Sequence, residues 1–181
     1  MKNDFKFCPI CGSKKIENHN DRKWLCPDCG FDLYNNVAAA VGVIITDDEK
    51  KVLLEVRAKN PRKGFLALPG GFVDPDESAE EAAKRECREE IGIDVKNVKF
   101  LCSFPNTYEY KNITYKTCDL FFTANVSENF KNIDELIANL KAQETEVSGF
   151  KSYKIENCDD VDKIPLAFES AVKTLKFFVG Q

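Results

Sequence analysis

Two apolar stretches in the first third of the chain predict the strands of a buried sheet. Residues 37–46, VAAAVGVIIT, are almost continuously apolar and rich in β-branched side chains, which is typical of a buried strand. The polar turn DDEK follows, and residues 51–58, KVLLEVRA, predict a second strand, so we expect a hairpin. Further strands are expected in VKFLCSF, TYKTCDLFFTANV and EVSGFKSYKI, which are residues 98–104, 114–126 and 146–155.

Two helices are expected from other patterns. Asp76 or Ser78 can cap the start of one helix, acidic residues follow where its dipole is positive, and Gly92 can end it in the left-handed conformation. Near the end of the chain, residues 169–179, ESAVKTLKFFV, repeat apolar side chains at helical spacing and predict an amphipathic helix. We therefore predict an α/β fold in which helices flank a mixed sheet.

Four of the eight cysteines form a regular pattern near the start of the chain. Two C-x2-C pairs each enclose a proline and are followed by glycine, in CPICG and CPDCG. Two residues between thiolates let one tight turn present both sulfurs to the same ion, and two such turns complete a tetrahedral structural zinc site. A redox pair is disfavoured because the motif repeats with the same flanking residues. The predicted zinc ligands are Cys8, Cys11, Cys26 and Cys29.

A change of composition after residue 35 predicts two domains, a zinc ribbon in residues 1–35 and a larger domain in residues 36–181. The four remaining cysteines occur singly in apolar surroundings, and we expect them to be buried. They are Cys87, Cys102, Cys118 and Cys158.

Charge and hydropathy limit the partners and the location of the protein. The net charge is −4, and residues 1–34 hold six basic and five acidic side chains, so neither the chain nor the ribbon predicts a nucleic-acid surface. A structural or homodimer-forming role for the ribbon is therefore expected. No apolar run approaches the roughly 20 residues that span a bilayer. The first residues, MKNDFKFCPICG, lack the apolar core of a signal peptide, so a cytoplasmic location without membrane partners is expected.

The second predicted domain places three acids on one face of its first helix. At about 100° per residue, Glu86, Glu89 and Glu90 fall within about a third of the circumference. Like charges one turn apart destabilise a helix by a few tenths of a kcal/mol, and only Arg85 can reach Glu89 at the i+4 spacing. A solvated acidic face is the alternative. The shared stripe favours binding of Mg²⁺ or Mn²⁺, which prefer oxygen ligands.

These acids lie in residues 70–93, GGFVDPDESAEEAAKRECREEIGI, which resemble the Nudix box. The box reads Gly, five residues, Glu, seven residues, Arg-Glu-apolar-x-Glu-Glu-x-Gly-apolar, with Cys87 as the first apolar residue here. The other fixed positions are filled by Gly71, Glu77, Arg85, Glu86, Glu89, Glu90, Gly92 and Ile93. The resemblance extends from about residue 36 onward. It implies the Nudix α/β/α sandwich with a mixed sheet, in which the box forms a loop, a helix and a loop.

The resemblance also implies an activity, the hydrolysis of the pyrophosphate bond in a nucleoside diphosphate linked to another group. Glu86, Glu89 and Glu90 would hold Mg²⁺ or Mn²⁺ together with the backbone carbonyl of Gly70. Glu77 and Arg85 would keep the ligands in place. Nudix enzymes often use a further acid from a later loop, for which this chain offers Glu144 and Glu146. We favour Glu146, because the pair Glu146-Val147 at the start of a predicted strand resembles the family's position better.

A zinc ribbon before a Nudix domain is similar to the arrangement in NADH pyrophosphatases, which split NADH and can remove NAD caps from RNA. Those enzymes carry a Ser-Gln-Pro-Trp type signature, whereas residues 103–110 here read SFPNTYEY and keep only the Ser and the Pro. ADP-ribose, NADH and related ADP-linked compounds are therefore all candidate substrates, and capped RNA is the one nucleic acid among the expected partners. Tyr108, Tyr110 and Tyr115 could stack on a base or could fill cross-strand pairs.

Two other functions are compatible with the same scaffold. One is a nucleotide-sensing Nudix regulator that binds without cleavage, although such a protein has no need for the complete set of acids. The other is an enzyme similar to isopentenyl-diphosphate isomerase, which would need an apolar pocket and groups for proton transfer.

Overall fold

The protein is described by a computed structural model that covers residues 5–111, 113–125, 130–140 and 145–181. The chain divides into two compact units, Met1–Val37 with Glu109–Tyr115, and Ala38–Tyr108 with Lys116–Gln181. The boundary predicted between residues 35 and 36 stays a prediction. Among the described residues, no helix is long and apolar enough to cross a membrane.

The first unit contains a small antiparallel sheet. Its strands are β1 (Glu17–His19), β2 (Lys23–Leu25) and β3 (Asp32–Tyr34), in that order across the sheet. Trp24 on β2 is buried, and its ring meets that of Phe5 edge-to-face at a centroid distance of 5.1 Å. A sheet this small cannot bury much apolar surface by itself, and the same unit contains the cysteine cluster described below.

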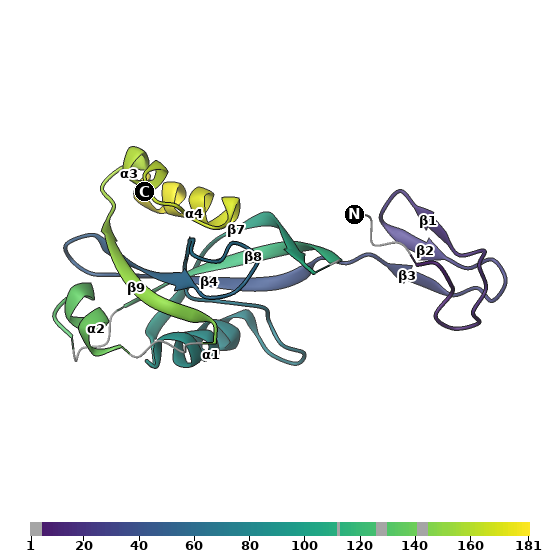
Figure 1. Ribbon diagram of the computed structural model, residues 1–181, viewed down its shortest axis with the longest axis horizontal. Coiled ribbons are helices and arrows are strands. Elements are labelled where there is room, and N and C mark those ends of the chain that lie inside the picture. Colours follow the sequence, from purple (N-terminus) through teal and green to yellow (C-terminus); the bar gives the residue numbers. More distant parts are fainter. Residues whose placement is uncertain (1–4, 112, 126–129, 141–144) are drawn as a thin grey trace. The chain divides into compact units, whose positions relative to one another are not determined.

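The second unit is built on a mixed sheet (Figure 1). The strands lie in the order β6-β5-β4-β8-β7, and β9 pairs with β5. Strand β4 runs parallel to β8 but antiparallel to β5. Their bounds are β4 Ala38–Thr46, β5 Lys51–Arg57, β6 Leu66–Ala67, β7 Lys96–Tyr110, β8 Ile113–Asn125 and β9 Val147–Lys154.

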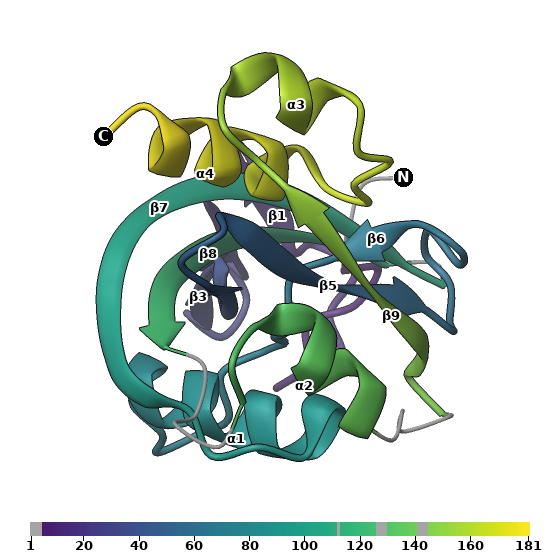
Figure 2. The same cartoon turned by 90° about the vertical axis from the view of Figure 1, so that its left-hand side faces the viewer.

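Helices cover both faces of this sheet. Figure 2 shows α1 (Ala79–Ile91) and α2 (Ile133–Asn139) on one side, and α3 (Cys158–Asp162) and α4 (Glu169–Val179) on the other. Each face has its own apolar core, because successive side chains of a strand point to opposite faces. Val43 of β4 packs in the core with α1, and its neighbour Ile44 packs in the core with α4. The predicted α/β/α sandwich with a mixed sheet is therefore confirmed.

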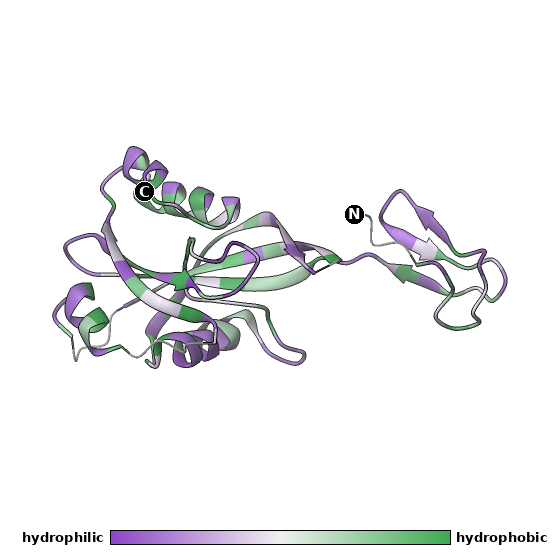
Figure 3. Ribbon diagram, in the orientation of Figure 1, coloured by the Kyte–Doolittle hydropathy of each residue, from purple (hydrophilic) through white to green (hydrophobic). Residues whose placement is uncertain are grey.

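The distribution of hydropathy follows these layers. Hydrophobic colours concentrate in β4 and along α4, whereas α1 is mostly hydrophilic in colour (Figure 3). Helix α1 still buries six side chains, two of which are glutamates. Burying charge on a helix that packs against a core is costly unless the charge is compensated. The helix predicted to carry the site thus differs from an ordinary amphipathic helix.

Several features were missed or wrongly predicted from the sequence. Helices α2 and α3 are short, and each begins after an asparagine whose side chain caps the first turn, Asn132 and Asn157. An Asn followed by acidic residues is a signal that could have found them. The cysteine prediction fails for Cys158, which is exposed at the start of α3. Cys102 and Cys118 are only partly buried, and Cys87 alone is fully buried as expected.

Candidate active site

Helix α1 is fixed at both ends by the residues expected to cap it. The Ser78 hydroxyl accepts a hydrogen bond from the Glu81 amide at 3.2 Å, and the Glu81 carboxylate accepts one from the Ser78 amide at 2.9 Å. This reciprocal pair is the capping box. At the other end, Gly92 has φ +69° and donates to the Arg88 carbonyl. The positions of the acids along α1 are therefore set locally.

Two glycines bring the preceding loop against these acids. The Gly70 amide donates to the Glu90 carboxylate at 2.8 Å, and the Gly71 carbonyl accepts from the Val41 amide at 2.8 Å. Gly70 has φ +147°, and a side chain there would collide with the Val41 carbonyl. A Cβ on Gly71 would stand 2.5 Å from the Glu86 carboxylate. Only glycine therefore allows the loop to lie between β4 and α1.

Arg85 connects the loop to the acids. Its guanidinium donates to both carboxylate oxygens of Glu77, at 2.9 and 3.0 Å, and to the Phe72 carbonyl at 3.0 Å. One nitrogen also donates to Glu86 at 2.8 Å and to Glu89 at 3.3 Å. The paired bonds to Glu77 lower the pKa of that carboxyl group. The structure thus brings Glu77, Arg85, Glu86 and Glu89 together around one guanidinium.

Three carboxylates, one of them bonded to this guanidinium, are buried close to one another. Glu86 and Glu90 are each 8% exposed, and Glu55 on β5 is 3% exposed. Burial raises the pKa of Glu90 to about 8, with the Glu86 charge adding to the effect. Burial also raises the pKa of Glu86, although Arg85 opposes the shift. For Glu55, burial and then the Glu90 charge raise the pKa well above its usual range.

Glu55 was not predicted from the sequence. It stands in an otherwise apolar strand, KVLLEVRA, and a lone acid at a position facing the helix layer was the available signal. Its Oε1 is buried and has no hydrogen-bond partner among the described residues. An unsatisfied buried carboxylate oxygen is rare in a folded protein. This oxygen and the raised pKa values of Glu86 and Glu90 mark a site that has too little positive charge.

The donor set fits a hard divalent cation. It consists of carboxylate oxygens from Glu86, Glu89, Glu90 and Glu55, which is the ligand type of Mg²⁺ and Mn²⁺. Glu89 is half exposed, so this side of the site faces solvent. In the described part of the chain, only the four ribbon cysteines bring three or more ligand atoms within 4.8 Å of one another. The acids of α1 are held further apart than this, because the Arg85 guanidinium lies between Glu86 and Glu89 and donates to both.

Glu146 lies at the edge of this site. Its negative charge contributes to the raised pKa values of both Glu86 and Glu90, which places it near the buried acids. Its carboxylate is half exposed and forms an ion pair with Lys59 at 2.8 Å. Its backbone carbonyl accepts from the Ala58 amide at 2.8 Å, which ties the start of β9 to the end of β5. Glu144, the alternative predicted acid, lies outside the described residues.

Aromatic rings continue from the glycine loop. The Phe72 ring meets Tyr108 edge-to-face at 5.5 Å, and Tyr108 lies 5.7 Å from Phe168, the residue before α4. The Arg57 guanidinium stands 5.1 Å from the Phe168 ring centroid. Phe72 is partly exposed, so this row of rings borders the acids and also faces solvent.

The ribbon cysteines form a second candidate metal site. Cys8 and Cys29 have their sulfurs 3.7 Å apart, as do Cys11 and Cys26, and all four lie within 4.8 Å of one another. Four sulfurs at about 2.3 Å from a tetrahedral zinc ion would be about 3.8 Å apart. Both turns have the same form, since the amides of Gly12 and Gly30 donate to the first cysteine of each pair at 2.9 Å. The predicted cysteine cluster is confirmed.

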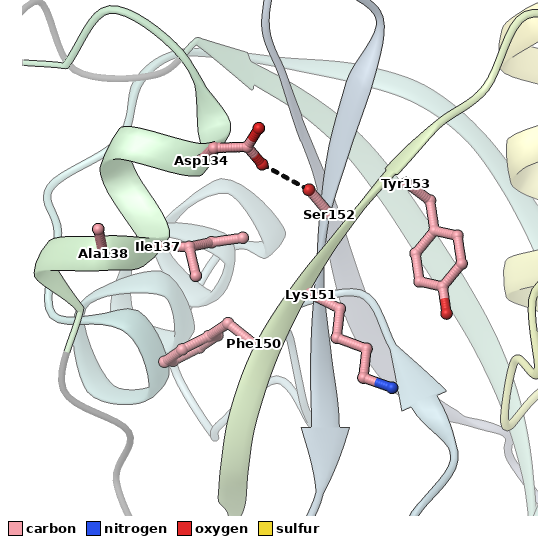
Figure 4. A pocket seen from close by; sticks show the side chains of 7 residues that line it. All are labelled: Asp134, Ile137, Ala138, Phe150, Lys151, Ser152 and Tyr153. Carbon is pink, nitrogen blue, oxygen red and sulfur yellow. Dashed lines mark hydrogen bonds between the residues drawn. The ribbon is translucent and has the colours of Figure 1, made fainter.

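A depression of about 430 Å³ lies between α2 and β9 (Figure 4). Its polar groups include Asp134 and Ser152, which are hydrogen-bonded to each other at 2.6 Å. Among the described residues that were predicted as site residues, none lines it. It is therefore separate from the acids of α1.

Comparison with known proteins agrees with this geometry. The family model for the NUDIX domain matches residues 37–171. The chain is 34% identical over 107 residues to the NAD-capped RNA hydrolase NudC of Vibrio atlanticus, which covers 58% of this chain and 38% of that protein. It is 35% identical over 103 residues to the protein of the same name from Deinococcus radiodurans, covering 55% and 36%. The chain thus matches less than two fifths of the length of these curated relatives.

Solved structures share the fold. A NUDIX hydrolase from Nitrosomonas europaea is 24% identical and superposes with a TM-score of 0.63, covering 97% of this chain and 91% of that one. The NUDIX domain of Shewanella oneidensis NrtR, solved with ADP ribose, is also 24% identical, with a TM-score of 0.60 and coverage of 84% and 90%. At these identities the likeness concerns the fold alone.

Proposed function

The chain belongs to the NUDIX domain family, and from that premise we propose that it hydrolyses the pyrophosphate bond of a nucleoside diphosphate linked to a further group. One observation carries the proposal. Three carboxylates, Glu55, Glu86 and Glu90, are buried together at the loop of Gly70 and Gly71. When ionised, such a cluster is unfavourable unless cations neutralise it, and a diphosphate substrate is recognised through such cations.

Glu86, Glu89 and Glu90 would hold Mg²⁺ or Mn²⁺ with the Gly70 carbonyl, and Glu55 would add buried charge behind them. A bound divalent ion supplies charge neutralisation at phosphoryl oxygens and a water of lowered pKa. The role of Arg85 is to orient Glu86 while its paired bonds to Glu77 keep the loop in place. Arg85 and Glu77 are therefore positioning residues.

Glu146 would accept the proton of the attacking water. Its carboxylate is half exposed at the edge of the buried acids, where a water molecule can approach it. The ion pair with Lys59 keeps this carboxylate at the edge of the site, within reach of a water that a general base would deprotonate. Because Glu146 follows the undescribed residues 141–144 and precedes β9, its position depends on the backbone bond between its carbonyl and Ala58.

The substrate would be an ADP-linked compound. Relatives of this chain are named NAD-capped RNA hydrolases, and a structure with the same fold was solved with ADP ribose. ADP-ribose, NADH and capped RNA share a base next to a diphosphate. Phe72 and Tyr108 supply aromatic surface next to the acids, on which such a base could stack. A homodimer and a cytoplasmic location stay predictions.

The four ribbon cysteines would hold one structural Zn²⁺. Their sulfur spacing fits a closed tetrahedral site, and a closed site leaves no position for substrate. The ion would supply the stability that the small core around Trp24 does not.

The test is to incubate the protein with Mg²⁺ and, separately, ADP-ribose, NADH and isopentenyl diphosphate. We expect AMP from one or both of the first two compounds and no change in the third. Tight nucleotide binding without any AMP would instead identify a sensor, and conversion of isopentenyl diphosphate an isomerase. A variant with Glu86→Gln, Glu89→Gln and Glu90→Gln controls for contaminating hydrolases.

A further inference from the structure

A segment that starts near the end of β5 and runs past β6 has a charge unlike that of the whole protein. Residues 56–73 contain no Asp or Glu, although the chain has a net charge of −4. Within that segment, Arg57, Lys59, Arg62 and Lys63 place four cations in seven residues. All except Arg57 are exposed. A basic loop therefore lies directly before the glycine loop of the acid site.

The loop has a defined conformation. Arg57 Nε donates to the Pro61 carbonyl at 3.0 Å, and the Gly64 amide donates to the Arg57 carbonyl at 2.9 Å. Arg62 has φ +63°, a left-handed conformation that side-chain-bearing residues rarely adopt. Its guanidinium stands 5.8 Å from the ring centroid of Phe65, which is 40% exposed. The loop thus presents a cation and an aromatic ring to solvent together.

This pair continues the row of rings at the acid site. The Phe65 carbonyl accepts from the Arg57 amide at 3.0 Å, so Phe65 and Arg57 are neighbours across the backbone. Arg57 in turn contacts Phe168, and Tyr108 and Phe72 complete the row to the acids. The rings at the acid site therefore lead to Arg57, whose backbone is paired with that of Phe65 in the loop.

Alternating aromatic faces and cations are how proteins hold single-stranded nucleic acids. Bases stack on the rings irrespective of sequence, while Arg and Lys contact the phosphates. The alternative is a loop whose basic side chains are only solvated. It would account for the lysines, but it would not account for an exposed Phe65 ring in contact with the Arg62 guanidinium.

We propose that Arg62, Lys63 and Phe65 form a subsite for the nucleotide chain of a capped, single-stranded oligonucleotide. These three residues are called the loop subsite. A base of the chain stacks on Phe65, and its phosphodiesters contact Arg62 and Lys63. The inference rests on the proposed function for the cleavage of the cap, but the binding of the chain is a separate property.

The experiment compares two substrates in three proteins. The substrates are NAD⁺ and the same dinucleotide attached to the 5′ end of a five-nucleotide RNA. The proteins are wild type, Phe65→Ala and the double variant Arg62→Gln/Lys63→Gln. We expect the ratio of kcat/KM on the capped RNA to kcat/KM on NAD⁺ to fall at least about five-fold in both variants, the lower end of the effect of losing a stacking side chain. The charge-matched control is Lys131→Gln/Lys154→Gln, in which the ratio should not change.

Two further readouts make the result decisive. Binding of the double variant to the RNA should depend less on salt, by about 0.7 in the log–log slope for each phosphate that the variant no longer neutralises. An unchanged ratio in both variants would overturn the loop subsite, and so would an equal fall on both substrates. If wild type cleaves neither substrate, cleavage of the NAD cap is excluded, while hydrolysis of ADP-ribose is judged by its own assay. In that case, fluorescence anisotropy with a labelled, uncapped five-nucleotide RNA tests the binding of the chain. The affinity of both variants for this RNA should be at least about five-fold weaker than that of wild type, and equal affinities would overturn the proposal.

Discussion

The acids of α1 differ in their surroundings, residue by residue. Glu90 is buried and accepts from the Gly70 amide, Glu86 is buried beside Arg85, and Glu89 is half exposed. Removing charge from any of them leaves the apolar packing unchanged, since Gln has the same shape as Glu. Their roles in turnover can therefore be separated from their roles in folding.

Replacing Glu89 or Glu90 by Gln should lower kcat by orders of magnitude while the fold persists. The reason is that the divalent cation loses a ligand, which removes charge stabilisation made in the transition state. Steady-state kinetics at saturating Mg²⁺, with circular dichroism to confirm folding, measure the effect. Lys84→Gln, an exposed change on another arc of α1, should retain activity. Full turnover in either glutamate variant would contradict the assigned ligands.

The raised pKa of Glu90 predicts how stability depends on pH when Mg²⁺ and Mn²⁺ are withheld. The group titrates at about 8 in the folded protein and at 4.5 when unfolded, so the folded state binds more protons between these values. Stability should therefore fall as pH rises from about 4.5 to about 8, and Glu86 and Glu55 shift in the same direction.

Thermal unfolding of the zinc-loaded protein at pH 5.5 and pH 8 checks this expectation. Added Mg²⁺ should raise the Tm more at pH 8, because the cation binds the ionised carboxylates. In Glu90→Gln the dependence on pH should be weaker. A Tm that rises between pH 5.5 and pH 8 without Mg²⁺ would contradict the expectation. It would show that groups of the protein itself already neutralise the negative charge of these carboxylates.

Among the elements, α1 and α4 are fixed in different ways. Helix α1 has its own capping box and a glycine at its end. Helix α4 starts after Phe168, whose side chain forms no capping hydrogen bond, and a side chain of the sheet binds its first turn instead. Asp119 on β8 accepts from Ser170 at 2.7 Å and from Thr117 at 2.6 Å, and this buried network positions Phe168 beside Tyr108.

Replacing Ser78 by Ala should reduce the free energy of unfolding by about 1 kcal/mol, the usual effect of losing an N-cap. Chemical denaturation measures the loss, and Ser78→Thr should restore most of it. Ser148→Ala, which removes a hydrogen bond of 3.2 Å at the exposed start of β9, is a matched control with a smaller expected effect. Equal losses in the two alanine variants would mean that the capping box adds nothing specific.

Local patterns predicted the helix that carries the acids and its two ends. Ser78, Gly92 and the three glutamates are set by periodicity and capping within 15 residues, and such signals can be read from the sequence. Residues that join the site through the sheet could not be found in this way. Glu55 reaches Glu90 only because β5 lies in the same sheet as β4, and Lys59 reaches Glu146 because β5 pairs with β9.

For the whole molecule, the two units should respond differently to the removal of metal. A strong chelator should release one Zn²⁺ per chain and loosen residues 1–34, because the ribbon has little apolar core of its own. Hydrogen exchange should then increase in β1, β2 and β3 while β4 stays protected. Cys26→Ser should purify without zinc, whereas Cys158→Ser, a change at an exposed cysteine outside the cluster, should retain it. Zinc-free wild-type protein with a protected ribbon would contradict the expected role of the metal.

The buried Glu55 carboxylate has a consequence for attempts to make a more heat-resistant version of this protein. A design procedure that scores packing would replace Glu55 by a leucine or a glutamine and would raise the melting temperature in the absence of magnesium. Natural proteins often retain such unfavourable groups where activity depends on them. Substitutions that are meant to raise the melting temperature should therefore be sought on exposed surfaces such as the outer side of α3. Glu55 should be left unchanged.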